Sequence, residues 1–460
     1  MLYVDTLLGV KYYPKELKNL TMRFFSLELI ITVIYLSHAW ISLYYISILG
    51  SYALFGSIVA IGMFFGIVLD LPLGVLTDKF GQRGAFCAAL GCLTIYYLGL
   101  IFATNSFQLL CLEILVGVFS ALLSGSFIAW FLNSWENLVD RNEKSEILFR
   151  STMGNVKFVK MIAVSSLTIL GGILLYQVHL APQLIFLLQA FIALVGFILG
   201  FIIMVNYNPV GRNIGLRLTS ENNKSHPFSN IRILGNNLRI KYLAVSPYFL
   251  SFGILSFTSL AFTTIVFPLI IYSLLSSDNV VNGEYVKIDF SSLAILIISL
   301  INSITDFIYG ISSRFSGRFT SFIKSPRQGL VAFYTLNFPL AWILFFFILL
   351  VNISYYWRLI FIIIIFLSRL IISGLTSGLH WHLYYDITLS EYRSSQESYL
   401  NTLSLTVSII GFSILGLILE KIGFLETLLF LFMLSVIGIL LLFKAKEPGS
   451  KNSTNLRNSK

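Results

Sequence analysis

The chain alternates between long apolar runs and short polar segments. A helix that crosses a bilayer needs about 20 mostly apolar residues, so each run predicts one transmembrane helix. Twelve spans are expected, near residues 24–49, 51–72, 84–104, 107–132, 156–177, 182–205, 242–272, 290–313, 329–351, 357–381, 399–419 and 424–443. The first and seventh runs are long, which indicates a tilted or kinked helix. The pattern therefore predicts an all-α polytopic membrane protein.

One polar segment is longer than the others and divides the spans into two sets of six. Residues 206–240 are basic and rich in Asn, and we interpret them as a cytoplasmic linker. The predicted organisation is an N-terminal six-helix bundle (1–205), this linker, a C-terminal six-helix bundle (241–443) and a disordered cytoplasmic tail (444–460).

Composition excludes a soluble globular protein. Hydrophobic residues make up 57% of the chain and charged residues only 11%, against about 25% charged residues in an average protein. The formal charge of +10 comes from residues between the apolar runs, so no nucleic-acid partner is expected. Lys and Arg concentrate in alternate loops, which places both termini in the cytoplasm. We expect a multi-pass protein of the plasma (cytoplasmic) membrane, with no metal site and no cofactor.

A short charged pattern occurs twice, each time at the end of the second span of a six-span set. The first copy is DLPLGVLTDKFGQR at residues 70–83, and the second is DFIYGISSRFSGR at 306–318. The two copies are offset by 236 residues. At that offset Asp306, Gly310 and Gly317 match Asp70, Gly74 and Gly81, whereas Arg314 stands in place of Asp78. An internal repeat of this kind implies two structurally similar bundles.

The spacing of the first copy has a physical reason. Residues four apart share one helix face, and Gly74 on that face lets a neighbouring helix come close. Gly62 and Gly66 form a further pair of small residues on the same span. Asp78 is then expected at the cytoplasmic mouth, where its carboxylate can cap a facing helix or pair with a base. Gly81 permits a tight turn into the third span.

The first copy resembles the signature between the second and third helices of the major facilitator superfamily. The residues that fit the signature are Gly74, Asp78, Lys79, Gly81 and Arg83, whereas Gln82 stands where a basic residue is usual. The resemblance implies a monomeric twelve-helix carrier whose two bundles rock to expose a central site to either side in turn. It also implies that Asp78 helps to latch the cytoplasmic side.

Four ionisable residues inside the predicted spans are candidates for binding a solute or a proton, because such groups are costly in a bilayer. Arg369 lies near mid-depth of span ten and could hold an anionic group or form an ion pair with Glu113. Glu113 in span four could carry a coupling proton or be a paired acid. His38 in span one could pack structurally or bind, and Glu28 at the cytoplasmic end of that span could simply reach toward water.

These observations predict a secondary active transporter that moves a small solute by alternating access and is coupled to protons. The alternatives are an efflux carrier for drugs or amphipaths, a carrier-like sensor that does not transport, and a membrane-embedded enzyme. The Gly-Pro pair common in drug antiporters is missing before Gly171. A GxxxxGK[ST] nucleotide-binding loop is also missing, and no enzymatic activity is expected. The solute, the direction of transport and the coupling ion remain open.

Overall fold

The structure is a computed structural model of the 460-residue chain. It describes residues 8, 10, 13–139, 143–204, 247–276, 288–321, 323, 325–351, 354–387 and 393–444. Within the described helices, the side chains of some residues lie outside the description, among them Gly74, Asp78 and Lys79. The predicted linker 206–240 and nearly all of the tail 444–460 also lie outside it, so the predicted division into these segments stays a prediction.

Twelve helical segments in the described residues are long and apolar enough to cross a membrane. They are Lys15–Leu36, Tyr52–Asp70, Gln82–Phe102, Ser106–Trp135, Thr152–Tyr176, Pro182–Ile203, Pro247–Tyr272, Leu293–Phe315, Arg327–Ile348, Trp357–Thr376, Thr402–Lys421 and Phe424–Lys444. The predicted number of spans is therefore confirmed, and all but the first agree with the predicted bounds to within about five residues. The protein is a multi-pass membrane protein.

The helices are continuous in most spans. The first half contains α2 (Lys15–Ile31), the 3₁₀ helix η1 (Thr32–Leu36), α3 (Ile41–Leu49), α4 (Tyr52–Phe80), α5 (Gln82–Phe102), α6 (Ser106–Leu138), α7 (Glu143–Tyr176) and α8 (Pro182–Ile203). The second half contains helical residues 247–261, the π-helix η3 (Phe262–Val266), α10 (Phe267–Ser276), α11 (Leu293–Ser321), α12 (Pro326–Thr335), the π-helix η5 (Leu336–Leu340), α13 (Ala341–Leu350), α14 (Tyr355–Ile387), α15 (Arg393–Lys421) and α16 (Phe424–Lys444).

The predicted bounds of the first span, 24–49, are wrong. The helix begins at Lys15, tightens into η1, and is interrupted by turns at residues 37–40 before α3 begins. The Nε2 of Gln189 in α8 donates to the carbonyl oxygens of Val33 (3.0 Å) and Ile34 (3.2 Å) and to the Ser37 hydroxyl (3.1 Å). A break inside a bilayer is tolerated where neighbouring helices bind the freed backbone groups, and Gln189 does so here.

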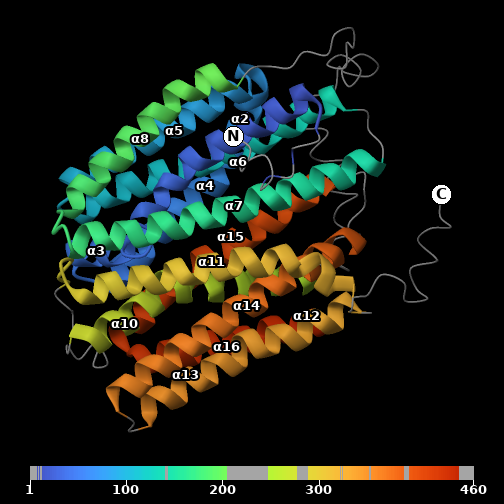
Figure 1. The fold of residues 1–460 in the computed structure, drawn as a ribbon. Helices are drawn as coiled ribbons and strands as arrows, with labels where there is room; N and C mark the ends of the chain where they lie inside the picture. The colour runs from blue at the N-terminus through green and yellow to red at the C-terminus, as the bar shows by residue number, and fades with distance from the viewer. Residues whose placement is uncertain are drawn as a thin grey trace.

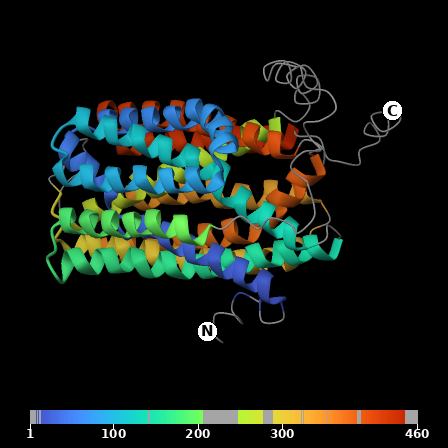
Figure 2. The same ribbon diagram turned by 90° about the horizontal axis from the view of Figure 1, so that it is seen from above.

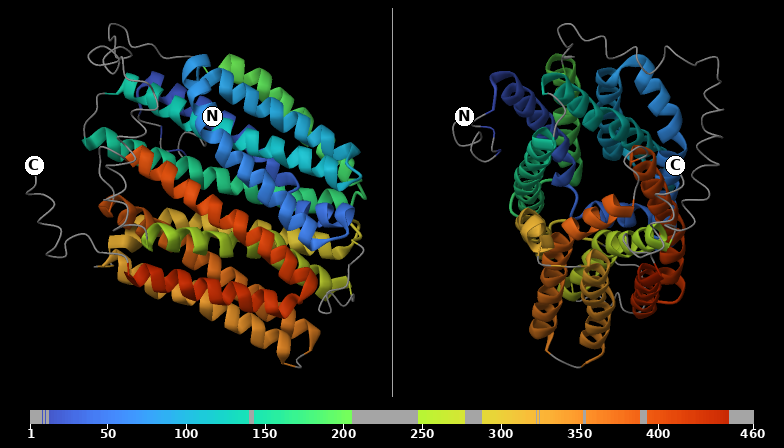
Figure 3. Two further views of the ribbon diagram at one scale, coloured as in Figure 1. Left: turned by 180° about the vertical axis from the view of Figure 1, so that it is seen from behind. Right: turned by 90° about the vertical axis from the view of Figure 1, so that its right-hand side faces the viewer.

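The helices form two groups, as the sequence repeat implies. The first half lies on one side of the molecule and the second half on the other (Figure 1), and a view along the bundle separates the two groups (Figure 3). The main contacts between them are those of α7 with α11 and of α4 with α15. The helices run along a common direction (Figure 2). We call one end of the molecule the Gly50 end; there the chain turns from α3 to α4 and from α15 to α16. We call the other end the Gly81 end; there the chain turns from α4 to α5.

Glycines set the closest helix contacts. A methyl group on Gly117 of α6 would lie 2.5 Å from the Gly62 carbonyl oxygen and 2.8 Å from the Gly66 nitrogen, both in α4. The predicted small-residue pair therefore brings α4 and α6 into backbone contact. Gly310 plays the same part between the halves, since a methyl group there would lie 2.7 Å from the Met161 Cβ atom. Gly81 has φ +87°, so the tight turn expected there is confirmed.

Candidate functional site

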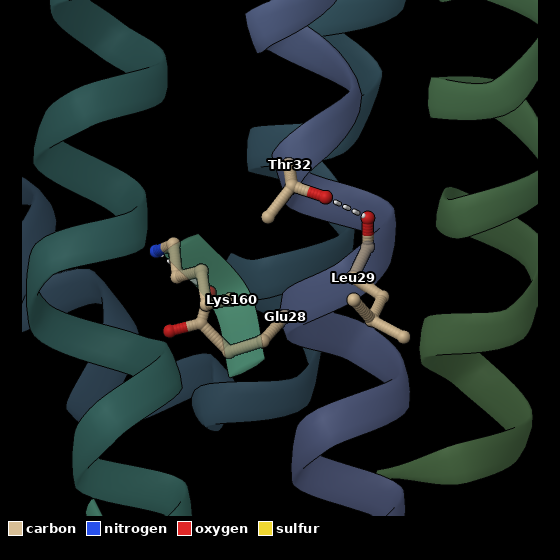
Figure 4. A network of polar contacts seen from close by, with 4 residues as sticks. All are labelled: Glu28, Leu29, Thr32 and Lys160. Carbon is tan, nitrogen blue, oxygen red and sulfur yellow. Dashed lines mark hydrogen bonds and ion pairs between the residues drawn. The ribbon is translucent and has the colours of Figure 1, made fainter. Parts of the chain in front are cut away.

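A charged pair joins two helices of the first half inside the membrane spans. The Lys160 ammonium group of α7 donates to a Glu28 carboxylate oxygen of α2 at 2.9 Å, with 22% and 14% of the two side chains exposed. Figure 4 shows the two side chains reaching toward each other from neighbouring helices. Because the first span begins at Lys15, Glu28 lies near its middle and not at its cytoplasmic end. Its predicted position was wrong, and its charge is paired.

The second half presents an acid to the same region. Asp306 lies near the middle of the span Leu293–Phe315, and its buried Oδ2 atom has no hydrogen-bond partner among the residues that the structure describes. Asp306 lies between Ser303 and Gly310, which contact Ser165 and Met161 of α7, the helix that carries Lys160. Tyr35 of η1 adjoins the same helix, since its carbonyl oxygen accepts from Thr168. We call Glu28, Lys160, Asp306 and Tyr35 the seam cluster. It contains one cation and two carboxylates, and it joins residues of both halves through α2, η1, α7 and α11.

Small polar groups line the contact between α7 and α11 beside this cluster. The hydroxyls of Ser165 and Ser303 are 2.9 Å apart across the two halves, and a methyl group on Gly172 would collide with the Ser299 side chain. Thr168 donates to the Tyr35 carbonyl oxygen at 3.4 Å. The contact is therefore close, and small polar side chains form part of it, together with Met161 beside Gly310.

His38 adjoins the seam cluster. It lies in the break of the first span, and its ring packs edge-on against Tyr35 with the centroids 5.2 Å apart. Its side chain is exposed. The break thus places an imidazole next to Tyr35 of the seam cluster, so His38 stays a candidate for proton or solute binding.

Glu113 forms a separate polar group inside the first half. The Tyr45 hydroxyl of α3 donates to its Oε1 atom at 2.7 Å, and the Tyr45 and Tyr96 hydroxyls are 2.9 Å apart. Gly62 leaves room for this carboxylate, because a methyl group there would lie 2.9 Å from Oε2. The structure joins α3, α4, α5 and α6 around one carboxyl group. Its predicted proton-carrying role stays a prediction.

Arg369 is deeply buried inside the second half, with 5% of its surface exposed. Its Nε donates to the Asn337 carbonyl oxygen at 2.9 Å. Its guanidinium carbon lies 4.6 Å from the ring centroid of Phe262 and 5.0 Å from that of Trp342. In the described part of the chain no carboxylate pairs with it, and the ion pair with Glu113 that the sequence left open does not form. Its Nη1 atom has no hydrogen-bond partner.

Replacing Arg369 by Met is expected to change the free energy of unfolding by less than about 2 kcal/mol. The lost hydrogen bond contributes about 1.5–3 kcal/mol, and each lost ring contact contributes about 2 kcal/mol when desolvated. These losses are offset by the several kcal/mol that burial of an unpaired cation costs. Chemical unfolding in detergent measures the change, with Arg358→Met as a control, a half-buried arginine in the first turn of the same helix that donates to the Val351 carbonyl oxygen. A much larger loss of stability would show that the ring contacts outweigh the burial cost.

The structure describes some side chains of the charged motif at residues 70–83 and of its second copy at 306–318. Asp70 accepts a hydrogen bond from the Ser124 hydroxyl of α6 at 2.8 Å, within its own half. The Arg83 guanidinium carbon lies 5.3 Å from the Phe201 ring centroid, and that of Arg314 lies 4.8 Å from that of Phe158 across the halves. The surroundings of Gly74 and the side chains of Asp78 and Lys79 lie outside the description, so the Asp78 latch stays a prediction.

No protein-family model and no curated protein matches this sequence. Solved structures do match the fold of this chain. A point mutant of the nucleoside transporter NupG is 14% identical over 93% of this chain and all of that chain, with a TM-score of 0.66. A second NupG structure gives 14% identity, 92% and 98% coverage and a TM-score of 0.63. The chain shares its fold with NupG. At this identity the likeness establishes the fold alone.

The contact between Lys160 and Glu28 brings in a residue that the sequence did not single out. Lys160 lies four residues inside the predicted span 156–177, and an intramembrane lysine is a functional candidate by default. Asp306 belongs to the repeat predicted at the end of its span, whereas it lies near the middle of Leu293–Phe315. The spacing of residues along each helix gave no sign that these two and Glu28 would meet, because they come from three separate spans.

Proposed function

We propose that this protein is a secondary active transporter that moves a small polar solute by alternating access between its two halves. The observation that carries the proposal is the seam cluster. It puts a Lys160–Glu28 ion pair in one half and Asp306, which has no cation partner among the described residues, in the other, inside the spans where the two bundles meet. Charged groups in a bilayer persist where they serve a binding or relay function. The fold shared with NupG, whose printed name is nucleoside transporter, supports the proposal.

We further propose that Asp306 is the group through which protons couple to transport. A buried carboxylate without a cation partner is stabilised when it binds a proton or accepts from a solute donor. Lys160 is already paired, so it does not neutralise Asp306 in this arrangement. The signature residues of the major facilitator superfamily and the shared fold support membership of that superfamily, and a monomer in the plasma membrane accords with it.

The test is uptake by purified protein in liposomes, with and without an inward proton gradient. Nucleosides are the first solutes to try, followed by sugars, organic anions and amphipathic cations. We expect accumulation of one polar class that responds to the gradient, and Asp306→Asn is expected to abolish the response to the gradient. Asp289→Asn, at an exposed turn of the same half, is the matched control.

Two outcomes would contradict the proposal. Transport of amphipathic cations alone would favour an efflux carrier. A folded protein that moves none of these solutes would favour a carrier-like sensor. If transport occurs but Asp306→Asn still responds to the gradient, the transporter assignment stands and the coupling role of Asp306 falls.

A further inference from the structure

One polar contact joins the two halves at the Gly50 end. A carboxylate oxygen of Glu420, near the end of α15, accepts hydrogen bonds from the Ser51 hydroxyl (2.5 Å) and from the Ala53 backbone nitrogen (2.9 Å). Ser51 and Ala53 begin α4, more than 360 residues earlier in the chain. The contact therefore connects the first half directly to the second.

The contact is well suited to the groups that form it. The first turn of a helix has backbone N–H groups without partners and carries a partial positive charge. Ser51 already caps α4, because its hydroxyl oxygen accepts from the Leu54 nitrogen at 3.1 Å, and its own proton is donated to Glu420. Hydrogen bonds to an ionised acceptor are about twice as strong as neutral ones. One carboxylate thus serves two donors of the facing half.

The helices touch closely just below this contact. A methyl group on Gly416 of α15 would lie 2.5 Å from the Tyr52 carbonyl oxygen, and one on Gly56 of α4 would collide with the Phe412 carbonyl oxygen. These glycines allow the approach but supply no hydrogen bond between the halves. Glu420 supplies the directional part of the contact. By comparison, Asp70, in the half of α4 nearer the Gly81 end, bonds within its own half.

We propose that Glu420 is a positioning residue that holds the two halves closed at the Gly50 end, and that its bonds to Ser51 and Ala53 break when this end opens. Its place in a transport cycle rests on the proposed function, whereas its role in holding the halves does not. The positive-inside pattern of the sequence makes the Gly50 end the outer one. Glu420 then acts at the opposite end of α4 from the predicted Asp78 latch.

The test is a distance measurement between the halves. Cys87, Cys92 and Cys111 are first replaced by Ser or Ala, and spin labels are attached after Phe102→Cys and Ile422→Cys. Both positions are exposed, at 72% and 63%, and lie at the Gly50 end in different halves. Glu420→Ala is expected to raise the ratio of long to short distances by about tenfold or more, since it removes two bonds to a charged acceptor. Glu420→Gln, which keeps one acceptor, should give a smaller rise.

Two further variants make the result specific. Ser51→Ala removes one of the two donors and should give an intermediate shift. Glu426→Gln, an acid in the first turn of α16 at the same end, should leave the distances unchanged. Unchanged distances in all Glu420 and Ser51 variants would overturn the proposal. If the distances shift but no solute is transported, the contact stands and the transporter assignment fails. If transport proceeds and the distances do not shift, the transporter assignment stands and the positioning role of Glu420 fails.

Discussion

Replacing Lys160 by Met is expected to lower solute uptake about 30-fold or more, the change that corresponds to 2 kcal/mol. The same change should lower the free energy of unfolding by about 2–3 kcal/mol, because it leaves Glu28 as an unpaired charge. The loss stays below the 3–5 kcal/mol typical of fully buried pairs, since the two side chains keep 22% and 14% of their surface exposed. Liposome uptake and chemical unfolding measure the two effects.

The double variant Lys160→Met with Glu28→Gln separates stability from function. Removing both charges should restore most of the stability, because a neutral pair carries no uncompensated charge. Uptake should stay low, since the cation of the seam cluster is gone. Lys157→Met is the matched control, because Lys157 lies about one helical turn from Lys160 on the same helix. Its Nζ atom lies 5.4 Å from the Tyr309 ring centroid. Normal uptake in Lys160→Met would remove the seam cluster from the transport mechanism.

Adding a single methyl group at Gly117 is expected to destabilise the protein by about 1–3 kcal/mol, the usual cost of overpacking. The methyl group of Gly117→Ala would press on backbone atoms of Gly62 and Gly66 at 2.5 and 2.8 Å, and backbone cannot move aside as a side chain can. The α4–α6 contact would open and disturb the room that Gly62 leaves for Glu113. Thermal unfolding in detergent measures the change.

Gly154→Ala provides the control with the opposite sign. Gly154 lies inside α7, and a methyl group there would meet no atom within 4 Å. The change should therefore stabilise the helix by up to about 1 kcal/mol through its better helix propensity. If both variants shifted the unfolding midpoint in the same direction by a similar amount, close packing of α4 on α6 would not be the cause.

The membrane spans can be predicted from the sequence, with one exception. Eleven spans match their predicted bounds closely because a run of apolar residues of spanning length has few alternatives to a helix in lipid. The first span does not, because its helix starts among polar residues at Lys15 and breaks at residues 37–40, where Gln189 of α8 binds backbone carbonyl oxygens just before the break. A side chain more than 150 residues away compensates for the break, and no local pattern announces it.

The candidate site was predicted only in its parts. Glu28, His38, Glu113 and Arg369 were found because an ionisable residue inside an apolar run stands out. Their partners were not, and the suggested pairing of Glu113 with Arg369 is wrong. Glu113 meets Tyr45, and Arg369 meets Asn337 and aromatic rings. Which residues face each other depends on how each helix is rotated about its axis, and tertiary packing fixes that rotation.

By itself the sequence determined a twelve-span membrane protein with a repeated motif, because composition and run length act locally along the chain. The tertiary structure alone decided that Lys160 pairs with Glu28 beside Asp306, and that Glu420 binds the start of α4. Those contacts join residues 132 and 369 positions apart. They form because glycine contacts bring particular helix faces together, and a charge buried there is stable only beside a group that can bind it.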